Sequence, residues 1–301
     1  MRIVSLVPSA TELLFALELD DEVIAVTHEC DHPPAALGLP RVTRDLIGPG
    51  LSANQIDAAV RERTERGESI YELDHDRVRE LDPDLIVTQA LCAVCAVSFD
   101  DVRALADRIP SRPRVISLDP STLGEVLEDV RRVASVTGRE AEGQALLRDA
   151  ASRIDRIALA VRGARRPRVA ALEWLDPVYV AGHWTPQLID YAGGEDVLGF
   201  PGERSTVCGW QEVAEARPDV VVVMPCGYDA RRARDEAQAH RESLDALGAG
   251  QVVAVDAAAY FSRPGPRLID GLELLAGILH PERLPSTGPD GHPDPRVVEL
   301  A

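Results

Sequence analysis

The sequence predicts an α/β protein of two similar lobes, each built on a parallel sheet, joined by one long linker helix and with a ligand cleft between them. Three observations lead to this prediction. Strand-like apolar runs alternate with helix-like segments, which is typical of parallel sheets covered by helices on both faces. The second half of the chain repeats the plan of the first. An amphipathic segment with helical period separates the two halves.

The first half alternates strands and helices from its opening residues. The run RIVSLV predicts a strand, and PSATE after it predicts a capping box between Ser9 and Glu12 at the start of a helix. The strand EVIAV, a proline-rich loop and a second capping box at Ser52 and Gln55 follow. DHDRVRELDPDLIVTQ predicts a helix, a turn and a buried strand, and RVISLD at 114–119 predicts a strand before the helix TLGEVLEDVRRVASVTG.

The second half contains the same strands in the same order. RPRVAALEW corresponds to MRIVSLVP, EARPDVVVVMPC to ELDPDLIVTQALC, and GQVVAVDA to RPRVISLDP. Leu85 and Val115 are 30 residues apart in the first half, and Val220 and Val252 are 32 apart in the second. The matched order and spacing indicate two lobes of similar topology.

A helix of unusual length is predicted between the halves. It runs from Arg139 to Arg165, and about 27 residues at 1.5 Å rise would make a rod of about 40 Å. Its apolar stripe, at spacings of three and four, consists of Leu147, Ala151, Ile154, Ala158 and Val161. We predict an N-terminal lobe at 1–136, the linker at 137–165, a C-terminal lobe at 166–285 and a loose tail at 286–301.

The charge and composition exclude several classes of partner. Fifty acidic residues against 32 basic ones give a net charge of −18, and such a surface repels nucleic acid and anionic lipid. No apolar stretch approaches the roughly 18 residues that span a bilayer, and the start MRIVSLVPSATE has no leader pattern. We expect no membrane span and a cytoplasmic location. The odd set of five cysteines favours reduced thiols over a disulfide framework.

Candidate ligand-binding residues gather where the predicted strands end. Parallel α/β sheets bind ligands at the carboxyl ends of their strands, and polar, aromatic and thiol side chains gather there. A single Trp is more often simply part of a core. In the first lobe the candidates are Pro8, Ser9, Cys30, Asp31, Gln89, Cys92 and Cys95. In the second lobe they are Trp174, Trp184, Cys226, Tyr260 and Arg263.

The pair Cys92-x-x-Cys95 admits four interpretations. It is a redox pair, part of a metal site, a lining of the cleft, or two small buried residues. A metal site would combine both thiols with His28 and Cys30, which suit Zn or another transition metal such as Fe.

Several motifs resemble one known family. RIVSLVPSATELLFALEL, ELDPDLIVTQ, EARPDVVVV and YFSRPGPRLIDGLELLAGILHP resemble the helical-backbone (class III) substrate-binding proteins, especially the vitamin B12-binding ones, over about residues 1–283. HECD and LCAVCA match a cytosolic branch described as cobalamin-binding. The resemblance implies a ligand held between two stiffly connected lobes, no catalysis, and cobalamin or a related corrinoid as the ligand. Coordination of the cobalt of such a corrinoid by His28, His32 or a cysteine is an alternative to the metal site. It also implies an importer or a corrinoid-using enzyme as partner, although the start of this chain lacks the export signal of transport members.

Two other functions stay open beside corrinoid binding. One keeps the fold and changes the ligand to a transition metal ion, heme or an iron complex, held through the Cys and His residues. The other is a thiol-dependent enzyme that acts on a corrinoid. The G-x-S-x-G elbow and the Walker loop are absent from the sequence. As the resemblance implies, we expect a non-catalytic binding protein.

Overall fold

The chain forms two compact units. The structure, a computed structural model, describes residues 1–48, 50–90, 97–284 and 297–300. Unit 1 comprises Met1–Pro120 and Leu127–Leu146, and unit 2 comprises Ser121–Val126 and Leu147–Ala301. The divisions fall within two helices, α5 (Leu123–Thr137) and α6 (Glu140–Ala160). The predicted boundaries at 136 and 165, by contrast, followed the ends of one helix.

Unit 1 is built on a parallel sheet with the strand order β2-β1-β5-β6. All four strands are short, and β1 and β5 are buried along their whole length, as expected of parallel strands covered on both faces. This confirms the strands predicted from RIVSLV, EVIAV, DLIVT and RVISLD. Their bounds are Ile3–Ser5 (β1), Val23–Ala25 (β2), Leu85–Thr88 (β5) and Arg114–Ser117 (β6).

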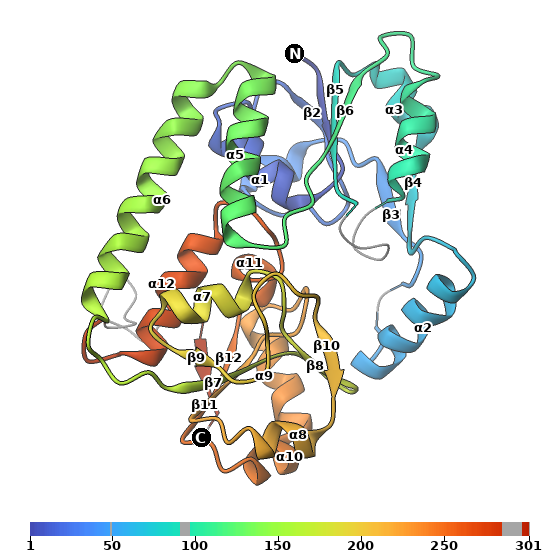
Figure 1. The fold of residues 1–301 in the computed structure, drawn as a ribbon. Coiled ribbons are helices and arrows are strands. Elements are labelled where there is room, and N and C mark those ends of the chain that lie inside the picture. Colours follow the sequence, from blue (N-terminus) through green and yellow to red (C-terminus); the bar gives the residue numbers. More distant parts are fainter. Residues whose placement is uncertain (49, 91–96, 285–296, 301) are drawn as a thin grey trace. The chain divides into compact units, whose positions relative to one another are not determined.

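Helices flank this sheet, and one of them begins differently from its prediction. Figure 1 shows α1 (Pro8–Ala16) on one side and α3 (His75–Leu81) and α4 (Phe99–Ala106) on the other. The predicted capping box of Ser9 and Glu12 is wrong, because Val7 is the N-cap residue and no side chain caps the helix. Pro8 occupies the first turn, where its missing N–H costs nothing. Ser9 therefore lies inside the helix and is buried.

The proline-rich loop after β2 leads to a small two-stranded sheet. It contains a 3-10 helix, η1 (Pro34–Gly38), and continues into β3 (Thr43–Asp45), which pairs antiparallel with β4 (Tyr71–Leu73). Between these strands lies α2 (Ala53–Glu65), whose predicted capping box is confirmed. Ser52 N donates to Gln55 Oε1 over 2.9 Å, and Gln55 N donates to Ser52 Oγ over 3.4 Å.

Unit 2 repeats the sheet of unit 1 and extends it. The parallel strands β9-β7-β11-β12 correspond in order to β2-β1-β5-β6, which confirms the internal repeat. Three antiparallel strands, β8, β10 and β13, make the sheet mixed rather than purely parallel as predicted. The bounds are Arg168–Leu175 (β7), Val178–Val180 (β8), Glu195–Asp196 (β9), Thr206–Cys208 (β10), Val220–Val223 (β11), Gln251–Val255 (β12) and Val297–Glu299 (β13).

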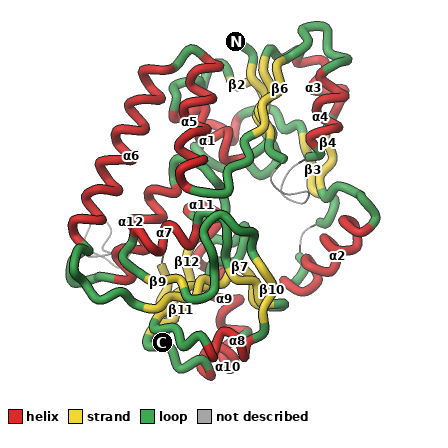
Figure 2. Tube along the Cα trace, viewed as in Figure 1, coloured by secondary structure: helices red, strands yellow, loops and turns green. Residues whose placement is uncertain are grey.

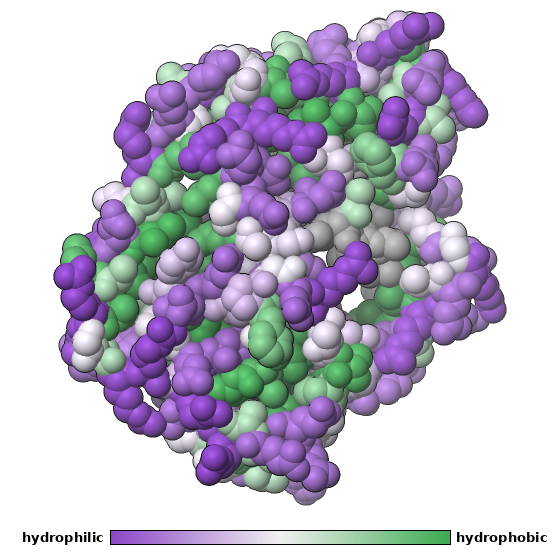
Figure 3. Space-filling model, viewed as in Figure 1, coloured by the Kyte–Doolittle hydropathy of each residue, from purple (hydrophilic) through white to green (hydrophobic). Residues whose placement is uncertain are grey.

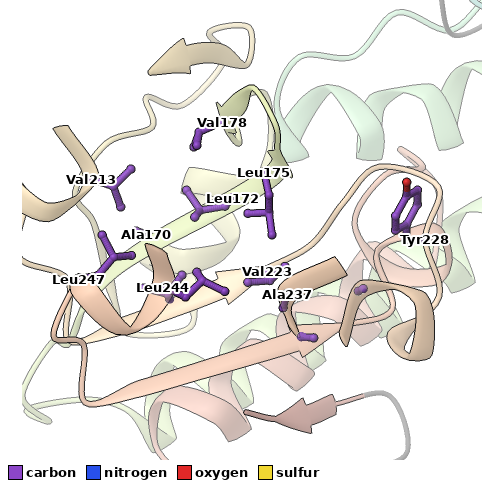
Figure 4. Packing of buried hydrophobic residues seen from close by; sticks show 13 residues of the cluster. Ala170, Leu172, Leu175, Val178, Val213, Val223, Tyr228, Ala237, Leu244 and Leu247 are labelled. Carbon is purple, nitrogen blue, oxygen red and sulfur yellow. The ribbon is translucent and has the colours of Figure 1, made fainter. Parts of the chain in front are cut away.

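Helices again alternate with the strands in unit 2 (Figure 2). α9 and α10 pack on one face of the sheet, where Figure 4 shows Ala237 and Leu244 beside Leu172 and Val223. α7 and α12 pack on each other. The bounds are Thr185–Tyr191 (α7), Trp210–Glu215 (α8), Ala230–Ala239 (α9), Arg241–Ala246 (α10), Ala257–Tyr260 (α11) and Leu268–Leu279 (α12).

The predicted linker helix is shorter and differently oriented than its apolar stripe indicated. α6 has 21 residues, which makes it about 32 Å long, and it ends at Ala160 instead of Arg165. Ala150 and Ile157 are its buried residues in unit 2, whereas Ala151 and Ala158 of the predicted stripe are exposed. Arg153 of α6 forms ion pairs with Asp270 and Glu273 on α12.

The last described residues form a strand, and much of the surface is hydrophilic. Val297–Glu299 of the segment predicted to be a loose tail form β13, which pairs with β12. Hydrophilic side chains cover much of the face in Figure 3, in keeping with the high content of charged residues. Within the described ranges, no helix combines the length and the apolar character needed to cross a membrane.

Candidate ligand-binding site

The loop after β2 contains the predicted site residues of unit 1 whose contacts are best defined. Thr43 on β3 holds His28 through two contacts: the backbone N–H of His28 donates to Thr43 Oγ1 over 3.1 Å, and His28 Nδ1 lies 2.7 Å from the same oxygen. The imidazole also lies against the ring of Tyr71 on β4, with centroids 5.2 Å apart. The small β3–β4 sheet therefore fixes both the position and the plane of a half-buried imidazole.

Cys30 lies at the base of the same loop. Its side chain is only 1% exposed, and Sγ lies 3.1 Å from both Thr11 Oγ1 and Thr27 Oγ1. Thr11 in turn donates to Ser5 Oγ over 2.8 Å. These contacts connect β1, α1 and the loop after β2 through buried hydroxyl and thiol groups. The thiol thus takes part in local hydrogen bonding at the carboxyl ends of two neighbouring strands.

Two further contacts hold this loop, and sequence reasoning missed the residues that make them. Tyr71 donates to Glu29 Oε1 over 2.9 Å, and Arg41 donates to the backbone oxygen of Thr27 over 2.6 Å. Neither Tyr71 nor Arg41 follows a strand of the main sheet, so the rule that guided the prediction did not select them. The one signal for Tyr71 is the extended run SIYEL, whose alternation is too short to indicate a pairing partner.

The other predicted residues of unit 1 differ in accessibility. Pro8, Ser9 and Gln89 are buried, whereas Asp31 is exposed. Beside Gln89, the hydroxyl oxygens of Thr88 and Ser117, opposite each other on β5 and β6, are buried and have no hydrogen-bond partner in the part of the chain that the structure describes. Cys92 and Cys95 lie outside the described residues.

In unit 2, Trp174 begins an aromatic stack at the carboxyl end of β7. Its ring meets Tyr228 edge to face, with centroids 5.4 Å apart, and the guanidinium of Arg232 lies 3.7 Å from the Tyr228 centroid. Burial raises the pKa of Tyr228. Trp174 Nε1 is buried and has no hydrogen-bond partner among the described residues. Its N–H is therefore a donor that the described residues do not satisfy.

Trp184 and Tyr260 occupy contrasting environments. Trp184 is 6% exposed and donates through Nε1 to Phe261 O over 2.8 Å, which favours the core interpretation of this Trp over ligand contact. Tyr260 and Arg263 are half-buried, and Arg267 lies over the Tyr260 ring at 5.8 Å. Gly271 on α12 allows the close approach of this segment, because a Cβ there would lie 2.4 Å from Tyr260 O.

Burial shifts the pKa of one histidine and one cysteine in unit 2. Burial, together with the charge of Arg204, lowers the pKa of His183, which precedes Trp184 and has a φ of 53°. Burial also raises the pKa of Cys208. Cys226 is exposed, and its backbone N–H donates to Glu173 O over 3.1 Å. A neutral imidazole and a protonated thiol are the forms that these environments favour.

The predicted metal ligands are only partly visible. Among the described residues, no three His, Cys, Asp or Glu side chains are placed to hold a metal ion together. Since Cys92 and Cys95 lie outside those residues, the predicted set of His28, Cys30, Cys92 and Cys95 stays a prediction. A separate cavity of about 330 Å³ between α4 and β6 contains none of the predicted site residues; it is lined by Phe99, Arg103, Ala106, Asp107, Pro113 and Val115.

Comparison with known proteins places this architecture among solute-binding proteins. The chain is 23% identical to the vitamin B12-binding protein of Vibrio cholerae over 280 residues, which are 92% of this chain and 88% of that protein. The solved structure of the periplasmic vitamin B12 binding protein of Vibrio cholerae superposes with a TM-score of 0.66 at 21% identity and covers 92% of this chain and 96% of that one. A periplasmic heme binding protein from Pseudomonas aeruginosa superposes with a TM-score of 0.70 at 20% identity and covers 100% and 98%.

The two structures show that the fold is that of two-lobed periplasmic binding proteins. The family model described as periplasmic binding protein matches residues 3–259, from the first strand to α11. This range contains every candidate residue named above except Tyr260 and Arg263. The family consists of binding proteins, in agreement with the prediction that the chain is not an enzyme. By its sequence and its fold, the chain belongs to the periplasmic binding protein family.

Proposed function

We propose that the protein binds a corrinoid such as cobalamin without converting it. The observation that carries the proposal is the match to a vitamin B12-binding protein over 92% of this chain, within a family of binding proteins. A match of this length includes both sheets and the loops at their carboxyl ends, where ligands of α/β proteins bind.

The side chains at these strand ends support a large ligand with an amide rim. A corrinoid offers a wide, nearly flat face and many amide groups, which need aromatic contacts and hydrogen-bond donors. Trp174 supplies an aromatic ring, and Tyr260 and Arg263 supply a second ring and a guanidinium. The prediction that the ligand lies between the lobes stays a prediction, and so does the cytoplasmic location.

Heme is the second candidate. The observation that favours it is the likeness to the heme binding protein of Pseudomonas aeruginosa, which covers the whole of this chain. Heme is also a flat macrocycle with a central metal, but its rim carries two carboxylates in place of amides, so an Arg such as Arg263 would pair with it directly. A bare Zn or Fe ion held by cysteines is the third ligand to be tested.

The test is to purify the protein from a host supplied with cobalamin and to record its absorbance spectrum and its content of Co, Fe and Zn. Stoichiometric Co with corrin bands supports the proposal. Fe with heme bands would show that the ligand is heme instead of a corrinoid. Zn or Fe without either spectrum would reject both macrocycles as ligands. Titration calorimetry with cyanocobalamin and with hemin then gives the affinity for each.

Variants separate the ways in which the ligand is held. Trp174→Ala should weaken corrinoid binding by about 10-fold or more, because an aromatic contact of this size contributes on the order of 1–2 kcal/mol. Trp210→Ala is the matched control, since Trp210 packs against the same core cluster but stacks on His240 and begins α8, before β11. Cys92→Ser with Cys95→Ser should leave corrinoid binding intact and abolish binding of a thiolate-bound metal.

The partner of this binding protein is proposed to be an importer or a corrinoid-using enzyme that receives the ligand. The binding protein itself is acidic, with a net charge of −18, which suits a partner with a basic face. Pull-down at low and at high salt with the ligand-loaded protein tests the partner, and cell fractionation tests the cytoplasmic location.

A further inference from the structure

Four histidines among the described residues differ in what their ring nitrogens contact. The Nε2 atoms of His75, His240 and His280 each contact an acceptor: Asp101 at 2.9 Å, Glu236 at 3.3 Å and Gly193 O at 3.2 Å. His28 is different, because its contacts are made by the backbone N–H, by Nδ1 and by the ring face. Its Nε2 makes no hydrogen bond or ion pair within the described residues.

The contacts of His28 are those of an imidazole prepared to coordinate a metal. Metal-binding imidazoles nearly always use one ring nitrogen for the metal and fix the other through a hydrogen bond. Thr43 Oγ1 provides this bond at 2.7 Å from Nδ1, and the Tyr71 ring, tilted by 57° against the imidazole, restricts rotation of the plane. The ring is thus oriented before any ligand arrives, with Nε2 as the available nitrogen.

The hydrogen-bond geometry also permits the required tautomer. Thr43 Oγ1 already accepts the backbone N–H of His28 at 3.1 Å and has a second lone pair available. If this lone pair accepts from Nδ1–H, Nε2 carries a free electron pair. Coordination at Nε2 would select this form, and the hydroxyl proton of Thr43 would turn to another acceptor.

The neighbouring thiol is less suited to this role. Cys30 Sγ is almost completely buried and lies between the hydroxyls of Thr11 and Thr27, so a large macrocycle would have to displace this packing to reach it. His28 is half-buried and lies in the same loop, at the carboxyl edge of the sheet where ligands bind.

We propose that His28 Nε2 binds the central metal of the macrocyclic ligand as an axial base, with Thr43 as the positioning residue. The inference rests on the proposed function and deepens it. It applies to a planar macrocycle whose metal has an open axial position, and cobalt of a corrinoid is the form that we test. In this step Nε2 donates its electron pair to the metal and the water bound there leaves, with no change in oxidation state.

Cobinamide is the suitable probe because it lacks the nucleotide base that occupies an axial position in cobalamin. The protein is loaded with cobinamide, the cobalt is reduced to Co(II), and the electron paramagnetic resonance spectrum is recorded. Coordination by one imidazole nitrogen predicts a triplet splitting of the cobalt lines. Protein that contains 15N-labelled histidine should change this triplet to a doublet, which requires no substitution and so is independent of folding.

Variants then assign the nitrogen to one histidine. His28→Ala should abolish the splitting and lower the affinity for cobinamide by about 10–100-fold, and added imidazole should restore the splitting. Thr43→Val should keep the splitting but weaken binding by about 10-fold. His75→Ala and His183→Ala are the matched controls and should leave the spectrum unchanged. Circular dichroism of each variant confirms that it is folded.

The outcomes for the two proposals are distinct. If neither cobinamide nor cobalamin binds to the unmodified protein, the proposed function fails. If cobinamide binds stoichiometrically but shows no nitrogen splitting, or keeps it in His28→Ala, the axial role of His28 is wrong while corrinoid binding stands. Loss of the splitting in His183→Ala instead would move the axial base to unit 2.

Discussion

Glu273 on α12 accepts two hydrogen bonds from Arg153 on α6, at 3.0 Å from Nε and 2.6 Å from Nη2. Asp270, one turn earlier on α12, accepts from the same guanidinium. The hydrogen bond from Arg153 lowers the pKa of Glu273, and the two carboxylates raise the pKa of Arg153. This bidentate, partly buried network attaches the second part of α6 to unit 2.

Arg153→Ala should therefore lower the free energy of unfolding. The loss should be about 1–3 kcal/mol, because the network is partly buried, Asp270 loses its ion pair with Arg153, and Glu273 keeps only its ion pair with Arg156. Urea unfolding followed by circular dichroism measures this change. Arg148→Ala is the matched control, since Arg148 is exposed on the same helix, and it should change the free energy by less than about 0.5 kcal/mol. Equal effects of the two substitutions would contradict a stabilising network.

Glu273 should also make stability depend on pH. Because its folded-state pKa is lowered, the ionised carboxylate stabilises the protein above the unfolded pKa of about 4.5. This stabilisation is lost as the pH falls through the lowered folded pKa. Glu273→Gln should thus destabilise the protein at pH 7, and the difference from the unmodified protein should shrink below about pH 4. Thermal unfolding at a series of pH values measures it, and a difference that stays constant with pH would exclude the ion pair as its cause.

Asp196→Asn should change the stability at neutral pH in the opposite direction to Glu273→Gln. Burial raises the pKa of Asp196, whose Oδ1 accepts from the backbone N–H groups of Leu198 and Gly199 while Oδ2 is buried without a partner among the described residues. With a raised folded-state pKa, stability is full below the unfolded value of about 3.8 and decreases as the pH rises through the folded pKa. The amide keeps Oδ1 and removes the buried charge.

We therefore expect Asp196→Asn to stabilise the protein at pH 7 and to have little effect near pH 3. Asp190→Asn is the control, because Asp190 is exposed and forms an ion pair with Arg166 on the surface. Thermal melting of both variants at the two pH values tests the sign. Destabilisation by Asp196→Asn at neutral pH would show that the orphaned oxygen is satisfied by a donor such as water.

Gly271→Ala should disturb the segment that carries Tyr260. The added Cβ would lie 2.4 Å from Tyr260 O and 3.0 Å from the Phe261 ring, and a backbone atom cannot move aside cheaply. Stability should decrease by about 1–3 kcal/mol, and corrinoid affinity should decrease with it if Tyr260 contacts the ligand. Gly124→Ala is the control, since its Cβ would meet Thr122 Oγ1 at an ordinary 3.9 Å. Unchanged affinity in a destabilised Gly271→Ala would argue against Tyr260 as a contact.

The main strands could be predicted from the sequence, because strands buried in a parallel sheet appear as continuous apolar runs. Short antiparallel strands such as β8 and β10 were missed, since three residues give no usable period. The capping box at Ser52 was predicted correctly and the one at Ser9 was not, because the residue pattern alone does not show that α1 starts directly at Pro8. Local chemistry identifies a cap only when the helix start is known.

The contacts around the candidate residues were only partly predictable from the sequence. The strand-end rule selected His28 and Cys30, which the structure places in one loop. It did not select Thr43 or Tyr71, because these residues reach His28 through the β3–β4 pairing, a contact between segments distant in sequence. Burial of Trp184 likewise depends on Phe261, 77 residues later. Nonlocal contacts of this kind carry no periodic signal.

The pairing of β13 with β12 has a consequence for synthesis on the ribosome. All four strands of the unit 1 sheet precede Pro120, so they can pair while most of unit 2 is still to be made. The edge of β12, with its buried Val253 and Val255, is covered only when Val297–Glu299 emerge. An uncovered apolar edge is a template for pairing with another chain, so nascent chains stalled before Val297 are expected to depend on chaperones more than finished ones.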